Sequence, residues 1–76
     1  MSFKMHFGHD IYHLRTDKLK LTQQQVADAT FISLREYQKI EKGEIAPGSD
    51  IFLRLVFFLN VNIENYRQDV LNRPPL

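Results

Sequence analysis

The stretch of sequence that decides the fold is residues 21–43, LTQQQVADATFISLREYQKIEKG. A hydroxyl side chain stands near the start of each half: Thr22 is followed three residues later by Gln25, and Ser33 by Glu36. Each pair matches the capping box that begins a helix, in which the side chain of each residue bonds the backbone N–H of the other. The stretch therefore predicts two short helices in succession.

A tight turn joins these two helices, since only Thr30, Phe31 and Ile32 remain between them. Two short helices joined by about three residues form a helix-turn-helix unit. Gly43 ends the second helix, because glycine tolerates the left-handed conformation common at helix ends. The faces that we expect to be buried carry Val26 and Ala29 on the first helix, and Tyr37 and Ile40 on the second.

Apolar residues at helical spacing predict three further helices. The first is expected at residues 8–17, with Ile11 and Leu14 on one face. The second is expected at residues 50–59, with Ser49 as its N-cap, Asn60 at its end and an apolar stripe of Phe52, Leu55, Val56 and Leu59. The third is expected at about residues 62–71. In the loop at residues 18–21, Leu19 is expected to enter the core. No run alternates apolar and polar residues as a strand would, so the sequence predicts an all-α domain of five helices.

Length and composition fit one globular domain, with 76 residues, 43% hydrophobic and 25% charged. We assign it to residues 1–76, with the motif at about residues 22–43 and a short flexible tail at about residues 72–76. The absence of cysteine excludes disulfides, cysteine-based zinc sites and thiol catalysis. The sequence shows neither a secretory signal nor the roughly 20 apolar residues of a membrane helix, so we expect a cytoplasmic protein.

Residues 8–66 resemble the phage Cro/repressor class of helix-turn-helix DNA-binding domains, the XRE family. The resemblance rests on the order and spacing of several pieces: Gly8, Ile11, Leu14 and Arg15; Leu21-Thr22-Gln23 with Val26 and Ala27; Ile32-Ser33; Ile40-Glu41-Lys42-Gly43; Pro47; and Leu59-Asn60-Val61 with Ile63. It implies a compact five-helix bundle of the lambda-repressor-like type. In such proteins the second helix of the motif lies in the major groove, and a two-fold dimer reads two half-sites about one helical turn apart.

Three features depart from the pattern of this family. The segment at residues 15–22 is one residue longer than the common form, so we expect the loop after the first helix to bulge. Phe31 stands where the family usually has glycine, which predicts either strain or a different turn, because a positive φ is unfavourable for phenylalanine. Phe57 and Phe58 stand where small or polar residues are usual.

The resemblance places base-reading side chains at the start of the motif's second helix. Arg35 can donate two hydrogen bonds to guanine, Glu36 can accept one from cytosine, and Leu34 can pack on a thymine methyl group. The alternatives are a capping bond for Glu36 and a solvated surface role for Arg35. The full set of predicted DNA-binding residues is Gln23, Ser33, Leu34, Arg35, Glu36, Gln38, Lys39 and Lys42.

Several of these residues are expected to contact phosphates and not bases. Gln23 lies at the N-terminus of a predicted helix, where free N–H groups favour a phosphate, and the family has a glutamine there. Lys39 and Lys42 would neutralise phosphates, and Lys18 and Lys20 could touch the flanking backbone. The alternative for each is an ordinary solvated side chain.

Two further groups of polar residues have other expected roles. The resemblance implies an ion pair between Arg15 and Glu41 that fixes the orientation of the motif. His9 and His13 share one helical face, but two histidines do not make a metal site, so we expect no metal. We also expect no cofactor, and no constellation in the sequence indicates an enzyme.

Apolar residues near the C-terminus are more numerous than the core requires. A large exposed apolar patch usually marks an interaction surface, and we expect Phe57, Ile63 and Tyr66 to form a dimer or partner surface. Alternatively, Leu53 and Phe58 pack beneath the fifth helix and only Phe57 is exposed.

Together these features predict sequence-specific binding of double-stranded DNA by a small transcriptional regulator. We expect a repressor that occupies its operator as a homodimer in the cytoplasm, at the nucleoid. The alternative is an antitoxin or protein-interaction module of the same fold, which binds a protein partner through its apolar C-terminal half. A third reading is that the fold persists without DNA binding, which the net charge of only +1 would permit.

Overall fold

The computed structural model describes residues 2–72 and contains only helices over that range. In chain order these are α1 (Phe3–His13), the π-helical turn η1 (Leu14–Leu19), α2 (Gln23–Thr30), α3 (Leu34–Glu41), α4 (Ser49–Leu59), the 3-10 turn η2 (Ile63–Tyr66) and α5 (Arg67–Leu71). The predicted all-α fold of five helices is confirmed. No helix within these residues is both long and apolar enough to cross a membrane. Of the predicted tail, only Asn72 is described.

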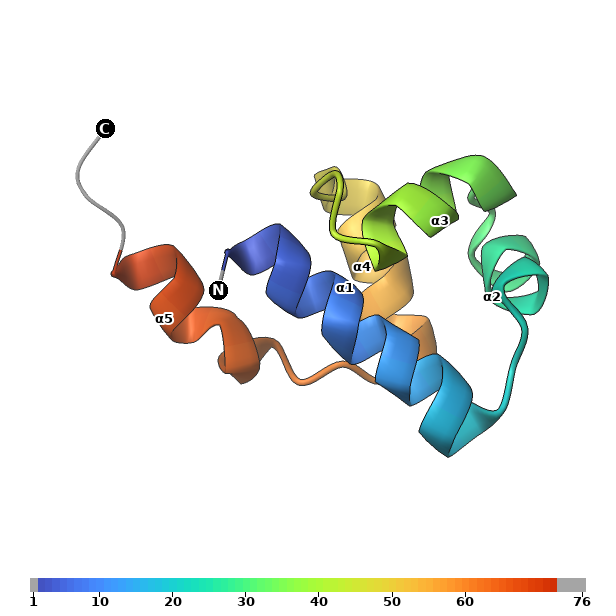
Figure 1. Cartoon of the computed structure of the whole chain (residues 1–76), viewed down its shortest axis with the longest axis horizontal. Helices are drawn as coiled ribbons and strands as arrows, with labels where there is room; N and C mark the ends of the chain where they lie inside the picture. Colours follow the sequence, from blue (N-terminus) through green and yellow to red (C-terminus); the bar gives the residue numbers. More distant parts are fainter. Residues whose placement is uncertain (1, 73–76) are drawn as a thin grey trace.

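The five helices place the helix-turn-helix pair at one end of the molecule. Figure 1 shows α2 and α3 together at that end, with η2 and α5 at the other end beside the start of α1. α3 packs against both α1 and α2, and α2 also contacts α4. The motif is therefore held from behind by α1 and α4, and it lies away from the C-terminal helix.

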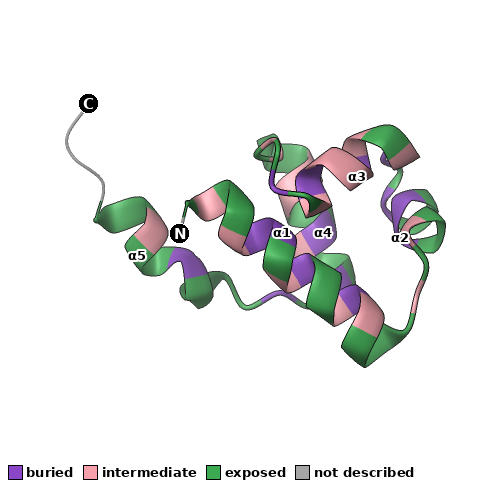
Figure 2. Cartoon of the chain, in the orientation of Figure 1, coloured by how far each residue is buried: buried purple, intermediate pink, exposed green. Residues whose placement is uncertain are grey.

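The core consists of apolar side chains from every α-helix except α5. Figure 2 shows buried positions on the sides of α1, α3 and α4 that face one another. The buried apolar residues are Phe7, Ile11, Val26, Ala27, Ile32, Tyr37, Ile40, Leu55, Leu59, Val61 and Tyr66. The expectation that Ala29 faces inward is wrong, since Ala29 is exposed and Ala27 is buried beside Val26.

The first helix begins five residues earlier than predicted. Ser2 caps it, and the Ser2 hydroxyl accepts a hydrogen bond from the backbone N–H of Met5. Gly8 therefore lies within α1, where it permits a close approach to α3. A Cβ atom at Gly8 would lie only 2.6 Å from the carbonyl oxygen of Ile40 and 2.7 Å from that of Glu41.

The extra residue after the first helix is absorbed by a widened helical turn. Leu14–Leu19 is π-helical, a form that accommodates one more residue per turn than the surrounding α-helix. The expected bulge thus lies in the helix and not in the loop. Lys20 then reverses the chain in a left-handed conformation, with φ of 57°. Leu19 is 39% exposed, so the expectation that it enters the core is wrong.

Both helices of the motif are capped as their hydroxyl residues predict. At Thr22 the full capping box forms, with the backbone N–H of each of Thr22 and Gln25 bonded to the side chain of the other at 2.8 and 3.1 Å. At Ser33 the hydroxyl accepts from the backbone N–H of Glu36 at 3.1 Å. The second bond of a capping box, from the backbone N–H of Ser33 to the Glu36 carboxylate, does not form. The Glu36 carboxylate is therefore not used in capping.

The turn between α2 and α3 is strained at Phe31. Its φ of 58° lies in the left-handed region, and its side chain is 86% exposed. The guanidinium of Arg54 donates to the carbonyl oxygens of Thr30 and Phe31 at 3.5 and 3.4 Å, which steadies the end of α2. Of the two alternatives for a phenylalanine in place of glycine, the structure therefore has the strained turn.

The remaining helix ends lie close to their predicted positions. Gly43 and Asn60 both adopt the expected left-handed conformation, with φ of 77° and 58°. Ser49 is the first residue of α4 and not its cap, since Gly48 occupies the N-cap position and has no side chain to bond. Asn62 caps η2 through its side chain, so the predicted fifth helix is realised as η2 followed by α5.

Replacing Phe31 by glycine should stabilise the domain. Glycine adopts positive φ without steric cost, whereas other L-residues lose roughly 1–2 kcal/mol there. We expect Phe31→Gly to raise the free energy of unfolding in urea by about 1 kcal/mol. The matched control is Phe57→Gly, which removes another highly exposed ring, from the interior of α4, and should lower that free energy by about 1 kcal/mol. Equal losses in both variants would contradict the strain at Phe31.

Candidate nucleic-acid interface

The outward side of α3 carries most of the predicted DNA-binding residues. Tyr37 and Ile40 anchor the opposite side of the helix in the core, and both are fully buried. Arg35 and Lys42 are exposed on the outer side, and Gln38 and Lys39 are half-buried beside them. The helix is thus fixed from behind and presents polar, mostly cationic groups to solvent.

The first residues of α3 surround a shallow depression on the same surface. It is lined by Ser33, Arg35, Glu36, Lys39 and Ile45. Ser33 is exposed, and Leu34 and Glu36 are half-buried. All the predicted residues of α3 are therefore reachable from outside the molecule.

A carboxylate behind this surface joins three segments of the chain. The guanidinium of Arg15 donates to Glu41 through Nε and Nη2, at 2.9 and 2.8 Å. The two side chains are only 10% and 5% exposed, so the implied ion pair is present and nearly buried. Arg15 also donates to the carbonyl oxygen of Leu21 at 2.9 Å, which ties η1 to the chain just before α2.

Two more donors complete the coordination of Glu41. The hydroxyl of Tyr37 donates to Oε2 at 2.5 Å, and Nε2 of Gln23 donates to Oε1 at 2.9 Å. With the two bonds from Arg15, the carboxylate accepts four hydrogen bonds, about as many as a carboxylate has lone-pair sites. We call these four residues, Arg15, Gln23, Tyr37 and Glu41, the Glu41 cluster.

The cluster holds Glu41 in its ionised form. Burial by itself would raise the pKa of the Glu41 carboxyl, but the hydrogen bonds from Arg15, Tyr37 and Gln23 outweigh it and leave the pKa below its usual value. Burial, together with the bond to Glu41, raises the pKa of the Tyr37 hydroxyl far above its usual value. Tyr37 is therefore always a donor to Glu41 at physiological pH.

The side chain of Gln23 is occupied within the protein. Its Nε2 donates to Glu41, and its Oε1 accepts a hydrogen bond from Nε2 of Gln38 at 3.1 Å. Gln23 thus links the cluster to the outer side of α3. These bonds of the Gln23 side chain were not predicted from the sequence, because Glu41 and Gln38 lie 18 and 15 residues away in sequence. The i,i+4 spacing of Tyr37 and Glu41 was the one local signal for the cluster.

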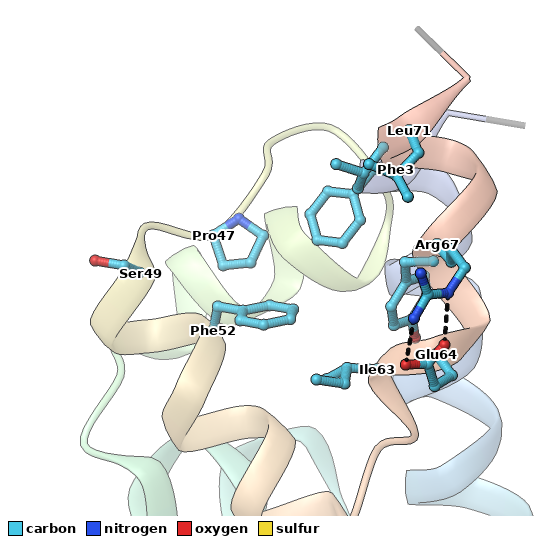
Figure 3. A pocket seen from close by; sticks show the side chains of 10 residues that line it. Phe3, Pro47, Ser49, Phe52, Ile63, Glu64, Arg67 and Leu71 are labelled. Atoms are coloured by element: carbon cyan, nitrogen blue, oxygen red, sulfur yellow. Dashed lines mark hydrogen bonds and ion pairs between the residues drawn. The ribbon is translucent and has the colours of Figure 1, made fainter.

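Of the three residues of the predicted apolar surface, Ile63 and Tyr66 line one groove and Phe57 lies outside it. Tyr66 lines the groove but is only 3% exposed, and its hydroxyl donates to Asp10 at 2.7 Å, so it offers almost no exposed surface, contrary to the expectation. Ile63 is 56% exposed and lines an apolar groove of about 570 Å³ (Figure 3). Phe57 is 78% exposed but does not line this groove.

The groove and the outer side of α4 are separate apolar features. Figure 3 shows the rings of Phe3 and Phe52 facing Ile63, with a bidentate pair between Glu64 and Arg67 at the rim. The outer side of α4 carries Leu53, Phe57 and Phe58. The alternative that Leu53 and Phe58 pack beneath the fifth helix is wrong, since they are 48% and 40% exposed.

Two of the three histidines, His6 and His13, pair with carboxylates. Nδ1 of His6 lies 2.6 Å from Asp69, and Nδ1 of His13 lies 2.7 Å from Asp17. The rings of His9 and His13 are in edge contact. Within residues 2–72, no three histidine or acidic side chains gather as metal ligands would.

The fold and this surface together define a helix-turn-helix protein. The family model described as Helix-turn-helix matches residues 11–65, most of the chain. The chain belongs to this family, the XRE-type helix-turn-helix proteins. DNA-binding transcription regulation is the kind of role that the family has. No curated protein and no solved structure matches the chain.

The depressed pKa of the Glu41 carboxyl should make the domain less stable in acid. Stability from an ionised Glu41 is present above the ordinary glutamate pKa of 4.5 and is lost as the pH falls through the lower folded-state value. At neutral pH, Glu41→Gln should cost roughly 3–5 kcal/mol of unfolding free energy, because Arg15 keeps a buried charge without its partner. Urea titrations at neutral and acidic pH should show this cost shrinking as the pH falls.

Tyr37→Phe is the milder companion variant. It removes one of the four donors to Glu41 and leaves the buried ring in place. We expect Tyr37→Phe to lower the free energy of unfolding by about 1 kcal/mol at neutral pH. This difference from the wild type should also become smaller in acid. A cost of either variant that stays constant from neutral to acidic pH would contradict the proposed origin of the acid sensitivity.

Proposed function

We propose that this protein binds double-stranded DNA sequence-specifically by placing α3 in the major groove, and that it represses transcription by occupying an operator. The observation that carries the proposal is the outer side of α3, where Arg35 and Lys42 are exposed and Gln38 and Lys39 lie beside them. Because Tyr37 and Glu41 fix the helix from behind, these side chains are held for contact with a rigid partner. A groove of B-form DNA admits such a helix.

Base contacts would come from the first turn of α3. Arg35 would donate two hydrogen bonds to guanine O6 and N7. Leu34 would pack on a thymine methyl group, and Glu36 would accept from cytosine N4. Support for the role of Glu36 comes from its carboxylate, which is not used in a return bond to Ser33.

Phosphate contacts would fix the register of the helix in the groove. Lys39 and Lys42 supply positive charge, and the Ser33 hydroxyl, which accepts from Glu36, keeps its own hydrogen for a phosphate oxygen. At the N-terminus of α2, Gln23 would contribute its backbone N–H, since its side chain is occupied. Lys18 and Lys20 are exposed on η1 and the following turn, which supports a role for them in contacting flanking phosphates.

A two-fold dimer would let two copies of α3 read two half-sites. We place the dimer contact at the groove lined by Ile63, because its exposed apolar lining continues into Val70 and Leu71 of α5. The exposed Glu64–Arg67 pair at its rim is self-complementary, so the two residues could also pair with their copies across a two-fold axis. DNA binding of this kind would place the protein at the nucleoid in the cytoplasm.

A second function is favoured by a different surface. On the outer side of α4, Phe57 is 78% exposed together with Leu53 and Phe58, and it lies outside the groove. An antitoxin or protein-interaction module of this fold would bind a protein there. The two functions can be separated by variants, because DNA binding depends on the outer side of α3 and a protein partner would depend on the outer side of α4.

Variants of α3 should separate base readout from phosphate binding. Arg35→Ala should cost about 1–3 kcal/mol on the preferred duplex and little on unrelated DNA, because it removes a base contact. Lys42→Ala should weaken all duplexes alike and reduce the dependence of log affinity on log salt by about one unit. Fluorescence anisotropy on preferred and scrambled duplexes at several salt concentrations measures both. If Arg35→Ala kept the preference intact, the proposed readout would be wrong.

A paired set of variants tests where the chain associates. Ile63→Glu places a charge in the groove, and Phe57→Glu places the same charge on the outer side of α4. We expect sedimentation velocity to show a dimer for the wild type and for Phe57→Glu, and a monomer for Ile63→Glu. The reverse pattern would move the contact to α4, and a wild-type monomer at high concentration would exclude the dimer.

A further inference from the structure

We propose that Gln38 reads an adenine, and that Glu41 and Gln23 act as positioning residues that decide which end of the Gln38 amide is offered to the DNA. The inference rests on the proposed function, since it assumes that α3 enters the major groove. It starts from one chain of hydrogen bonds, in which Gln38 donates to Gln23 and Gln23 donates to Glu41.

The direction of this chain is set at its buried end. An ionised carboxylate can only accept hydrogen bonds, and Glu41 accepts from Arg15, Tyr37 and Gln23. A glutamine side chain has one donor end and one acceptor end. Gln23 must therefore turn its NH2 group toward Glu41, because the opposite orientation would place two oxygen atoms against each other.

The orientation of Gln23 in turn fixes the orientation of the Gln38 amide. With its NH2 group turned inward, Gln23 presents Oε1 to Gln38, and only a donor can satisfy that oxygen. Gln38 therefore directs Nε2 to Gln23, at 3.1 Å. Neither amide has a free choice of orientation as long as Glu41 is ionised, and the low pKa of its carboxyl keeps it so.

What remains free on Gln38 matches one base. Nε2 of Gln38 has two hydrogens, of which Gln23 takes one, so a single N–H and the carbonyl oxygen are left. Adenine presents an acceptor at N7 and a donor at N6 in the major groove, which fits this pair. Guanine presents two acceptors, O6 and N7, and would set O6 against the Gln38 oxygen.

The position of Gln38 suits this contact. It lies one helical turn beyond Arg35 and one turn before Lys42, on the outer side of α3, and it is half-buried against Gln23. A side chain held in this way loses less freedom on binding than a free one. Arg35 and Gln38 would then read neighbouring base pairs as guanine and adenine.

Selection of bound sequences from random duplex DNA tests the inference, with four proteins in parallel. For the wild type we expect one position of each half-site to prefer adenine by roughly 10- to 100-fold. Gln38→Met should abolish that preference and leave the guanine read by Arg35. Gln23→Met should weaken the same adenine preference, although it touches no base itself. Gln24→Met, a change on the exposed side of α2 where Gln24 bonds Asp28, is the matched control and should leave all positions unchanged.

If the bonds of Gln23 to Gln38 and Glu41 only hold α2 and α3 together, the result should be different. Gln23→Met would then lower the midpoint of thermal unfolding and weaken binding to every sequence equally, with the adenine preference kept, and the positioning role would be wrong. If no position prefers adenine, or if Gln38→Met keeps that preference, the readout by Gln38 is wrong while the selected motif still supports DNA binding. A wild type that selects no sequence at all would instead remove the proposed function.

Gln38→Glu covers the case in which Gln23→Met fails to fold. A glutamate at this position cannot donate to Gln23 and offers only acceptors to the groove. The preferred base should then change from adenine toward cytosine, which presents a donor at N4. An unchanged adenine preference in Gln38→Glu would overturn the inference.

Discussion

The hydrogen bonds to the Glu41 carboxylate are the interaction on which the proposed DNA-binding surface depends. One nearly buried carboxylate receives donors from η1, α2 and α3, and these three segments share few other polar links. A buried carboxylate is costly unless all its lone pairs are used, and here they are. The position of α2 relative to α3, which defines any helix-turn-helix, is therefore set by hydrogen bonds with strict directions as well as by apolar packing.

Close backbone packing supplies the second constraint. Gly8 allows α1 to lie directly on the carbonyl oxygens at the end of α3, so the same region of α3 is held from two sides. The first turn of α3 has no such contact and faces solvent. The C-terminal half of α3 is thus fixed and its N-terminal half is accessible. In the proposed function this division would let the helix contact DNA without moving relative to its own domain.

Local signals in the sequence predicted the elements that local physics controls. The capping residues Thr22 and Ser33 and the left-handed Gly43 act within a few residues of themselves, and each lies where it was expected. The start of α1 was missed because the helix was predicted to begin at Gly8, whose close contact with α3 is made by residues far away in sequence. The internal bonds of Gln23 and the burial of Tyr66 were missed because their partners lie far away in sequence. Arg15 and Glu41 came from the resemblance to a family and not from spacing.

The widened turn at η1 lets the segment between α1 and α2 hold an extra residue without changing the contacts around it. In an ordinary helix each added residue rotates everything beyond it by about 100°, which would carry Leu21 away from Arg15. Here the additional residue is taken up between those two positions, and the bond between them is kept at 2.9 Å. Lys18 and Leu19 are both exposed there. Leu19 at this corner is therefore a suitable position for a fluorophore or spin label that reports on the domain without disturbing α3.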